Sequence, residues 1–174
     1  MALRVKGASE VIKELRKYGK DIETRINDET EAIAFQIEKD AKQRAPKNFG
    51  KLAQSISISQ PISDRGKAIE SRVITVNEDY GGYMEFGTGV KVNVPMEFKD
   101  LAASFKNNKK GTFKQALESI KLWCRAKGID EKAAYPILAK ILGAGVNPQP
   151  FLYPAWVKGK KDYLKNLNKL LNKK

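Results

Sequence analysis

Apolar residues recur at steps of three, four and seven positions over the first 45 residues of the chain. The positions are Val11, Leu15, Tyr18, Ile22, Ile26, Ile33, Ile37 and Ala41. This spacing puts their side chains on one face of an α-helix. Pro46 follows, and the residue before a proline avoids helical backbone angles, so the pattern predicts one long helix that ends near Ala45. Either the whole stripe packs on the protein's own sheet, or part of it faces another subunit.

Alternation of apolar and polar residues predicts three strands after this helix. The stretches are residues 55–59, 68–76 and 83–86, of which the last lies between glycines on both sides. Strands that follow one another through short connections form an antiparallel meander, which the long helix is expected to cover. In this arrangement Glu85 points to the polar side of the third strand. We expect it to pair with a lysine or arginine, in its own chain or across a subunit boundary.

The remainder of the chain predicts helices. Residues 95–143 form a helical insertion in which Thr112 and Asp130 are candidate helix caps and Pro136 either kinks or divides a helix. Three prolines within residues 148–154 then indicate a stiff segment that anchors Phe151, and a last helix follows. The expected fold is therefore α+β: a single domain over residues 1–174, with the insertion after the third strand and a basic C-terminal helix.

Charge and composition limit the classes of function. The 174 residues carry a formal charge of +13, which attracts nucleic acid, anionic lipid or an acidic protein. The chain contains no histidine and one cysteine, Cys124, so zinc sites, internal disulfides and histidine-based catalysis are disfavoured. No cofactor is expected. The apolar runs are shorter than a membrane span requires, and no membrane partner is expected.

The last helix concentrates positive charge. Its lysines include Lys158, Lys160, Lys161, Lys165 and Lys169. They form a solvated face, bind an acidic partner subunit, or face DNA inside a ring. Contact with DNA would use phosphate charge without reading the base sequence, and its affinity would decrease steeply with salt.

Three short motifs stand out along the chain: RAPKNFGKLAQSI at 44–56, YGGYMEFGT at 80–88 and PQPFLYPAW at 148–156. They resemble the motifs of a family of tail components from tailed bacteriophages and prophages. Their order, after a long helix and before a terminal one, is more specific than any one motif. The chain departs from the family pattern at Phe49, where threonine is usual, at Gly81, where alanine is usual, and in the length of the insertion.

This resemblance implies a structural protein of the phage neck, located in the virion and assembled in the host cytoplasm. Such a protein forms a ring, expected to be six-fold, that completes the tail and contacts other neck, connector and tail-tube proteins, with DNA passing through it. The resemblance carries over no catalytic, cofactor-binding or metal-binding residues. The positions that match the motifs, expected to be structural or interfacial, are Pro46, Gly50, Leu52, Ser55, Tyr80, Glu85, Phe86, Gly87, Thr88, Pro150, Phe151 and Pro154.

Other classes of function fit parts of the sequence. A free nucleic-acid-binding protein would use the basic surface together with the tryptophans and tyrosines. An enzyme built from carboxylates and lysines lacks support from a nucleotide loop or a metal cluster. A toxin or a regulatory module encoded by a prophage is compatible with the composition. Ring formation is the property that separates the neck protein from these alternatives.

Overall fold

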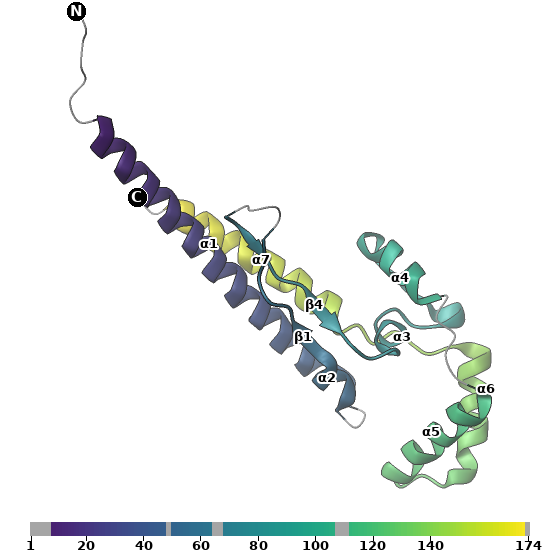
Figure 1. Cartoon of the computed structure of the whole chain (residues 1–174). Helices are drawn as coiled ribbons and strands as arrows, with labels where there is room; N and C mark the ends of the chain where they lie inside the picture. Colours follow the sequence, from purple (N-terminus) through teal and green to yellow (C-terminus); the bar gives the residue numbers. More distant parts are fainter. Residues whose placement is uncertain (1–7, 48–49, 64–67, 107–111, 173–174) are drawn as a thin grey trace, which may run out of the picture.

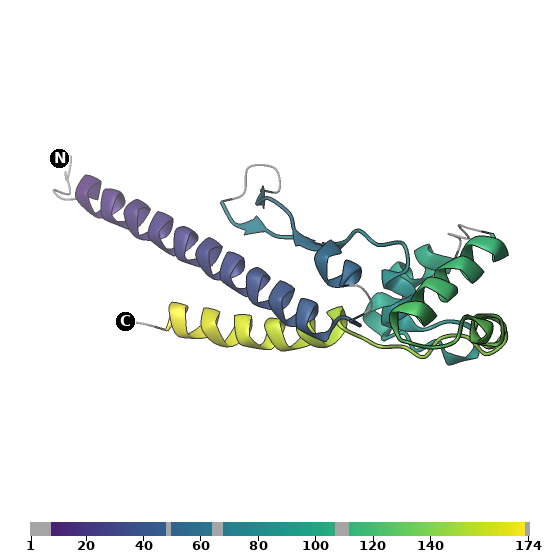
Figure 2. The same cartoon turned by 90° about the horizontal axis from the view of Figure 1, so that it is seen from below.

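The computed structural model describes residues 8–47, 50–63, 68–106 and 112–172. Two long antiparallel helices form a rod, a β-hairpin lies along the rod, and shorter helices gather at one end (Figures 1 and 2). The rod consists of α1 (Ala8–Arg44) and α7 (Leu152–Leu171). The expected α+β class is confirmed, with short strands and a predominance of helix.

Helix α1 confirms the long helix predicted from the apolar spacing, and its stripe divides into two parts. The buried members include Ile33, Ile37 and Ala41. The exposed members are Val11, Leu15 and Tyr18, with exposed fractions of 56, 64 and 62%. The C-terminal half of the helix therefore packs on its own chain, whereas the N-terminal half presents its apolar side chains to solvent.

Helix α7 covers the buried part of this stripe at close range. Gly159 lies directly against Ile37, and a side chain at this position would overlap the isoleucine. Polar pairs join Asp40 to Lys158 at 2.7 Å, Thr30 to Tyr163 at 2.8 Å and Glu29 to Asn166 at 2.7 Å. The order of these pairs shows that the two helices run antiparallel, and the glycine lets their backbones approach closely.

The sheet is a single interrupted hairpin. Its strands are β1 (Ile56–Ile58), β2 (Ile62–Ser63), β3 (Glu70–Ser71) and β4 (Ile74–Val76). Antiparallel pairing joins β1 to β4, with Ser57 opposite Thr75, and β2 to β3. The predicted strand at 55–59 is confirmed in its centre, while the one at 68–76 is divided in two. Asn27 of α1 binds the backbone of Glu70 and so fixes the hairpin to the rod.

The predicted third strand is wrong, because residues 81–86 form the helix α3 (Gly81–Phe86). No three-stranded meander exists in the described part of the chain, and the insertion follows α3. The helix buries Gly81 and Glu85, which are four residues apart and therefore share a face. Gly81 allows that face to lie against Val76, since a Cβ there would be 2.8 Å from its side chain. In so short a segment, alternation does not distinguish a strand from a helix.

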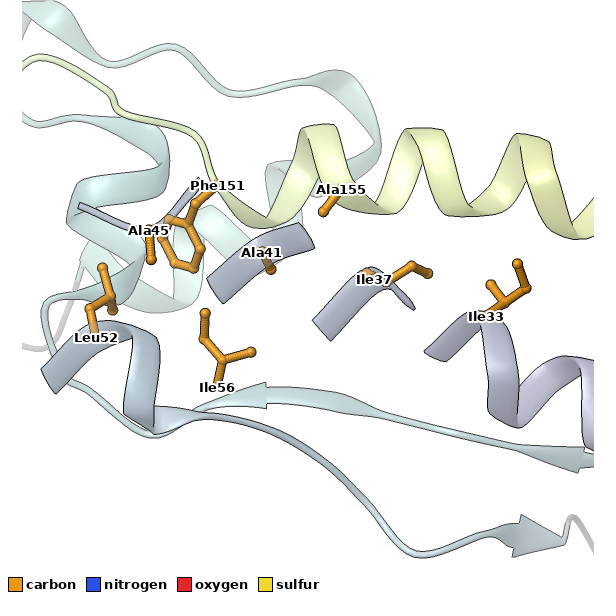
Figure 3. Packing of buried hydrophobic residues seen from close by; sticks show 8 residues of the cluster. All are labelled: Ile33, Ile37, Ala41, Ala45, Leu52, Ile56, Phe151 and Ala155. Atoms are coloured by element: carbon orange, nitrogen blue, oxygen red, sulfur yellow. The ribbon is translucent and has the colours of Figure 1, made fainter. Parts of the chain in front are cut away.

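The main hydrophobic core lies where α1, α7 and the hairpin meet. Its buried residues are Ile33, Ile37, Ala41, Ala45, Leu52, Ile56, Phe151 and Ala155. Leu52 belongs to the short helix α2 (Lys51–Ser55), which turns the chain from α1 into β1. Figure 3 shows Phe151 pointing from the start of α7 toward Ala45. Burying this ring contributes about 2 kcal/mol relative to exposure, so the predicted role of Phe151 as an anchor is confirmed.

Helices fill the predicted insertion. They are η2 (Met96–Phe98), α4 (Lys99–Lys106), α5 (Phe113–Ala126), η3 (Glu131–Ala133) and α6 (Ala134–Ala144), and the short helix η1 (Gly89–Lys91) precedes them. The buried residues at this end of the molecule are Cys124, Ala134 and Leu138, with exposed fractions of 0, 0 and 3%. Cys124 is thus a free thiol inside the core of this end.

The two helix caps predicted in the insertion are present, whereas Pro136 does not have its predicted effect. Thr112 caps α5 in a capping box with Gln115, and the Asp130 side chain accepts the backbone N–H of Lys132 at the start of η3. Pro136 lies in the first turn of α6, where a missing N–H costs little, so it neither kinks nor divides that helix.

Candidate functional site

The three motifs converge at the junction between the rod and the insertion. The first motif supplies α2 and the end of α1, the second supplies α3, and the third supplies the start of α7. Contacts among them surround the Glu85 side chain, which is only 6% exposed. We call this region the motif junction and define it by residues 45–47, 50–56, 80–88 and 146–156.

Glu85 holds the N-terminus of α7. Its Oε2 accepts the backbone N–H groups of Phe151 and Leu152 at 2.8 and 3.0 Å, and its Oε1 accepts that of Tyr153 at 2.8 Å. These N–H groups begin a helix and have no partner within it. A carboxylate at this end also interacts favourably with the helix dipole. The predicted ion pair with a lysine or arginine is therefore wrong, since helix backbone N–H groups take the place of a basic side chain.

Backbone contacts join the second motif to the third on either side of Glu85. The carbonyl of Met84 accepts the N–H of Gln149 at 2.7 Å. Thr88 donates its N–H to the Val146 carbonyl at 3.0 Å, and its Oγ1 accepts the Val146 N–H at 2.8 Å. The two segments are therefore paired along their length, and this pairing closes the chain at the point where the insertion leaves and returns.

Gly87 is required by this close approach. Its φ of 75° lies in the left-handed region that favours glycine. A Cβ at this position would be 2.9 Å from the carbonyl oxygens of Lys91 and Val146 and from Cδ of Pro148. Both the backbone angle and the available space exclude other residues, which explains the glycine of the second motif.

Aromatic side chains cover the outer side of the junction. Phe86 is buried, and its ring lies 6.3 Å from that of Phe98 in the insertion. Phe98 also meets Tyr153 and Trp156 edge-on, at centroid distances of 5.4 and 5.7 Å. Edge-on pairs of aromatic rings stabilise a fold by more than the burial of their apolar area alone. The aromatic group thus attaches the insertion to the third motif, and Phe86 has a structural role.

The first motif shapes the floor of the junction. Gly50 takes a φ of 71° before α2, and Leu52 is 1% exposed beneath α3. Ser55 closes α2 by donating its hydroxyl to the Leu52 carbonyl at 2.8 Å. Pro46 follows the end of α1, as predicted, and Phe49 lies outside the described residues.

Tyr80 and the two prolines complete the set of motif positions. Tyr80 is half-buried against the core, and burial, together with the nearby Glu78 carboxylate, raises the pKa of its phenol. Pro150 is exposed and precedes Phe151. Pro154 is the third residue of α7, within its first turn. The junction therefore brings together all the described motif positions.

The lysines of α7 lie apart from the junction and have different surroundings. Lys158 pairs with Asp40 at 2.7 Å, and the ammonium of Lys160 lies 4.7 Å from the centre of the Trp156 ring. Lys161, Lys165 and Lys169 are exposed at intervals of four residues. Two of the five lysines thus have partners within the chain, and the other three form a row.

Two concave features of the described structure, one beside Glu85 and one beside α4 and α6, are largely apolar, whereas an open hollow on α1 is lined mainly by charged side chains such as Glu38 and Lys42. A cavity of about 50 Å³ beside Glu85 is lined by side chains such as Val76 and Phe86, and a volume of this size holds only a few water molecules. An open groove beside α4 and α6 carries Lys99 as its charged side chain. Within the described ranges, no three His, Cys, Asp or Glu side chains gather to hold a metal ion. In the same ranges, every helix is too short or too polar to span a bilayer.

The role of Glu85 escaped sequence reasoning, although a signal was present. Pro150 and Pro154 have no N–H, and the three residues between them supply the N–H groups that the carboxylate accepts. A proline-bounded helix start with no capping side chain of its own requires an acceptor from elsewhere. A motif carboxylate is a suitable one.

Comparison with known families places residues 9–87 among the tail components of bacteriophages. The matching family is HK97-gp10-like, described as "Bacteriophage HK97-gp10, putative tail-component". The range includes almost all of α1, the hairpin and α3, so it confirms the resemblance seen in the first two motifs. The third motif lies beyond it. No curated protein and no solved structure gave a significant match. Residues 9–87 are therefore similar to a phage tail component.

Proposed function

We propose that the protein is a non-enzymatic subunit of the phage neck, which forms a ring that completes the tail and joins it to the connector. The observation that carries the proposal is the family match over residues 9–87, which form almost all of α1, together with α2, the hairpin and α3. Glu85 is a carboxylate of the kind that an enzyme could use, but its oxygens accept three backbone N–H groups at the start of α7.

The shape of the molecule supports an assembly role. The rod carries apolar side chains on exposed faces of both long helices, among them Leu15 at 64% and Leu164 at 52% exposure. Exposed apolar rows of this kind mark protein contacts. In a virion, such rows would face neighbouring copies of the chain or the adjoining neck and tail-tube proteins.

The test is made in the phage or prophage that encodes the chain. A stop codon early in the gene is expected to give filled heads and separate tails in the lysate, as seen by electron microscopy. Purified protein added to that lysate is expected to restore joined particles and plaques. Joined, infectious particles made without the protein would reject the proposal.

Nucleic-acid binding is the second candidate, favoured by the row of Lys161, Lys165 and Lys169 and the charge of +13. The test is a gel-shift titration with a random duplex at low salt and at about 0.5 M salt, where exposed charges are screened. A double variant, Lys161→Glu with Lys165→Glu, is compared with Lys132→Glu with Lys140→Glu, which changes the charge equally at exposed positions in the insertion. A function in DNA binding predicts loss in the first variant only.

A further inference from the structure

The N-terminal part of α1 extends beyond the end of α7. The polar pairs between the two helices, at about 1.5 Å per residue in both, place Leu171, the last residue of α7, roughly beside residue 24 of α1. Residues 8–22, which we call the overhang, therefore project about 20 Å past α7, as Figure 2 shows. The overhang is thus a single helix that protrudes from one end of the rod.

The overhang has an apolar face that its own chain leaves uncovered. Val11, Leu15 and Tyr18 lie at positions i, i+4 and i+7 and so form a row along one side of the helix. Farther along α1 the same face carries Ile33, which lies beside α7 and is only 7% exposed. On the overhang, by contrast, each of the three side chains is more than half exposed. An apolar helix face with this spacing is of the kind that binds in a groove of another protein.

A groove of matching character lies at the other end of the molecule. It has a volume of about 1070 Å³ and lies open between α4, α6 and the residues around α3. Its lining includes Val92 and Leu142, which are 45 and 64% exposed, and Ala102 and Ala103, whose small side chains leave space in it. Small-molecule sites have volumes of about 300–1,000 Å³ and enclose most of their ligand. This larger, open groove is better suited to an apolar helix face.

The overhang cannot reach the groove of its own chain. Helix α1 runs without interruption from Ala8 to Arg44, a length of about 55 Å at 1.5 Å per residue. It contains no proline at which it could bend back. In Figure 1 the start of α1 and the helices α4 and α6 lie at opposite ends of the molecule. Contact between an overhang and a groove therefore requires two copies of the chain.

Charges beside the two surfaces are complementary. Lys99 is exposed and is the charged side chain of the groove. On the overhang, Glu14 and Asp21 lie along one edge of the apolar face. Asp21 has an ion pair with Arg25 of its own helix at 2.9 Å. Glu14 is therefore the acid of this edge that can pair with Lys99 when the apolar face lies in the groove.

Two other contacts between copies fit these observations less well. Pairing of two overhangs about a two-fold axis leaves the groove uncovered and ends the assembly at two copies. Helix α7 also carries exposed apolar side chains, such as Leu164, but α1 lies beside this helix along its length. A single protruding helix enters a groove, whereas one side of a helix pair does not. The overhang is therefore the segment of this chain whose shape matches the groove.

We propose that the overhang of one copy docks in the groove beside α4 and α6 of the next copy, with Glu14 beside Lys99. The inference rests on the proposed ring-forming function and specifies its contact. Because the two surfaces differ and lie at opposite ends of the molecule, the contact is head-to-tail. Successive copies then follow one another in the same sense, as a ring requires, and the ring closes where the rotation between copies permits. Closure strengthens a weak contact, because each subunit is then held twice.

The test is sedimentation velocity of the full chain over a range of concentrations, with Leu15→Glu in the overhang and Leu142→Glu in the groove measured alone and mixed. The wild type is expected to self-associate. Each variant alone is expected to be monomeric, with affinity reduced at least about tenfold. The equimolar mixture is expected to form a 1:1 heterodimer, because Leu15→Glu retains the groove and Leu142→Glu retains the overhang.

Matched controls separate this contact from general effects. Leu122→Glu makes the same change as Leu142→Glu at an exposed position of α5 outside the groove. Phe35→Glu and Leu164→Glu change exposed residues of α1 and α7 outside the overhang. All three are expected to associate as the wild type does. Circular dichroism and thermal unfolding verify that the variants fold.

The charged pair gives a second test of the same contact. Glu14→Lys is expected to weaken association about two- to fivefold, since the pair is exposed. Lys99→Glu in the same chain is expected to restore it, because the two charges are then only exchanged between the surfaces. Lys132→Glu, at an exposed position elsewhere in the insertion, is the control. Equal restoration by both lysine variants would contradict the pairing of Glu14 with Lys99.

Several results would overturn the inference. Self-association of Leu142→Glu together with loss in Leu15→Glu would show that the overhang binds outside the groove, and loss in Leu164→Glu would move the contact to α7. Rings formed by both Leu15→Glu and Leu142→Glu would place the contact elsewhere and leave the ring intact. A wild-type chain that stays monomeric at all concentrations would reject this contact as well. The particle-joining test does not depend on association of the purified chain, so the two proposals can fail separately.

Discussion

The carboxylate of Glu85 accepts the backbone N–H of Phe151 at 2.8 Å, although the two residues are 66 positions apart. This contact joins α3 to the start of α7. It therefore links residues 9–87, which match the family, to the C-terminal helix. Phe151 is at the same time a member of the main core. Glu85 thus fixes the start of α7, and the ring of Phe151, the residue just before this helix, fills the core.

Glu85→Gln is expected to destabilise the protein by about 1–3 kcal/mol, because the side-chain amide has one acceptor oxygen where the carboxylate has two. At least one N–H group at the start of α7 would lose its partner. Urea unfolding followed by circular dichroism measures the change. Glu97→Gln, at an exposed position in η2, makes the same chemical change and is expected to have little effect. Equal effects from both variants would contradict the capping role of Glu85.

Gly159→Ala is expected to destabilise the rod by about 1–3 kcal/mol, since the added methyl group would overlap Ile37 and push the helices apart. Gly19→Ala provides the matched control within α1, where a Cβ would meet nothing within 4 Å. That substitution is expected to stabilise by about 0.5–1 kcal/mol, as alanine does in a helix. Thermal unfolding of both variants gives the comparison. A stabilising Gly159→Ala would show that the helices are less close than described.

Gly87→Ala is expected to cost more than Gly128→Ala. Both glycines have positive φ, 75° and 68°, and each substitution carries about 1 kcal/mol or more of backbone strain. Only Gly87 is also surrounded, with two carbonyl oxygens at 2.9 Å from a Cβ, whereas Gly128 has open space. The difference in unfolding free energy measures the steric part. Equal costs would mean that the segments at 84–88 and 146–150 separate readily.

Tyr80→Phe is expected to make stability less dependent on alkaline pH. Burial, with the nearby Glu78, raises the pKa of the Tyr80 phenol in the folded state, so the unfolded chain ionises first as pH rises. Its contribution is therefore complete below pH about 10 and decreases as pH rises through the folded-state pKa. Urea unfolding at pH 8 and above pH 10 tests this, with Tyr135→Phe at an exposed position as control. A parallel decrease in all three proteins would exclude Tyr80 as the cause.

Sequence patterns predicted those features whose determinants are local. The spacing from Val11 to Ala41 fixes α1, and Thr112 carries its capping partner three residues away. The burial of Phe151 is also predicted, because prolines stiffen the segment around it and a large apolar side chain gains free energy from burial. In each case, residues within one or two turns contain the information.

The features that were missed depend on residues distant in sequence. Residues 81–86 alternate as a strand does, and only the surroundings of Gly81 and Glu85 favour a helix. Glu85 was expected to meet a basic side chain, since charged partners are visible in a sequence. Backbone N–H groups are present at nearly every residue, so no residue type marks the few that need a partner.

Two hydrogen bonds join Thr88 to Val146, and this pairing affects how the sequence between them can change in evolution. The segment between them leaves and re-enters the core at one place, so its length can vary without moving Glu85 or Phe151. Descendants could exchange the whole group of short helices for a different one, or for a short loop. The protein would then present a different surface at this end, while the rod kept its geometry.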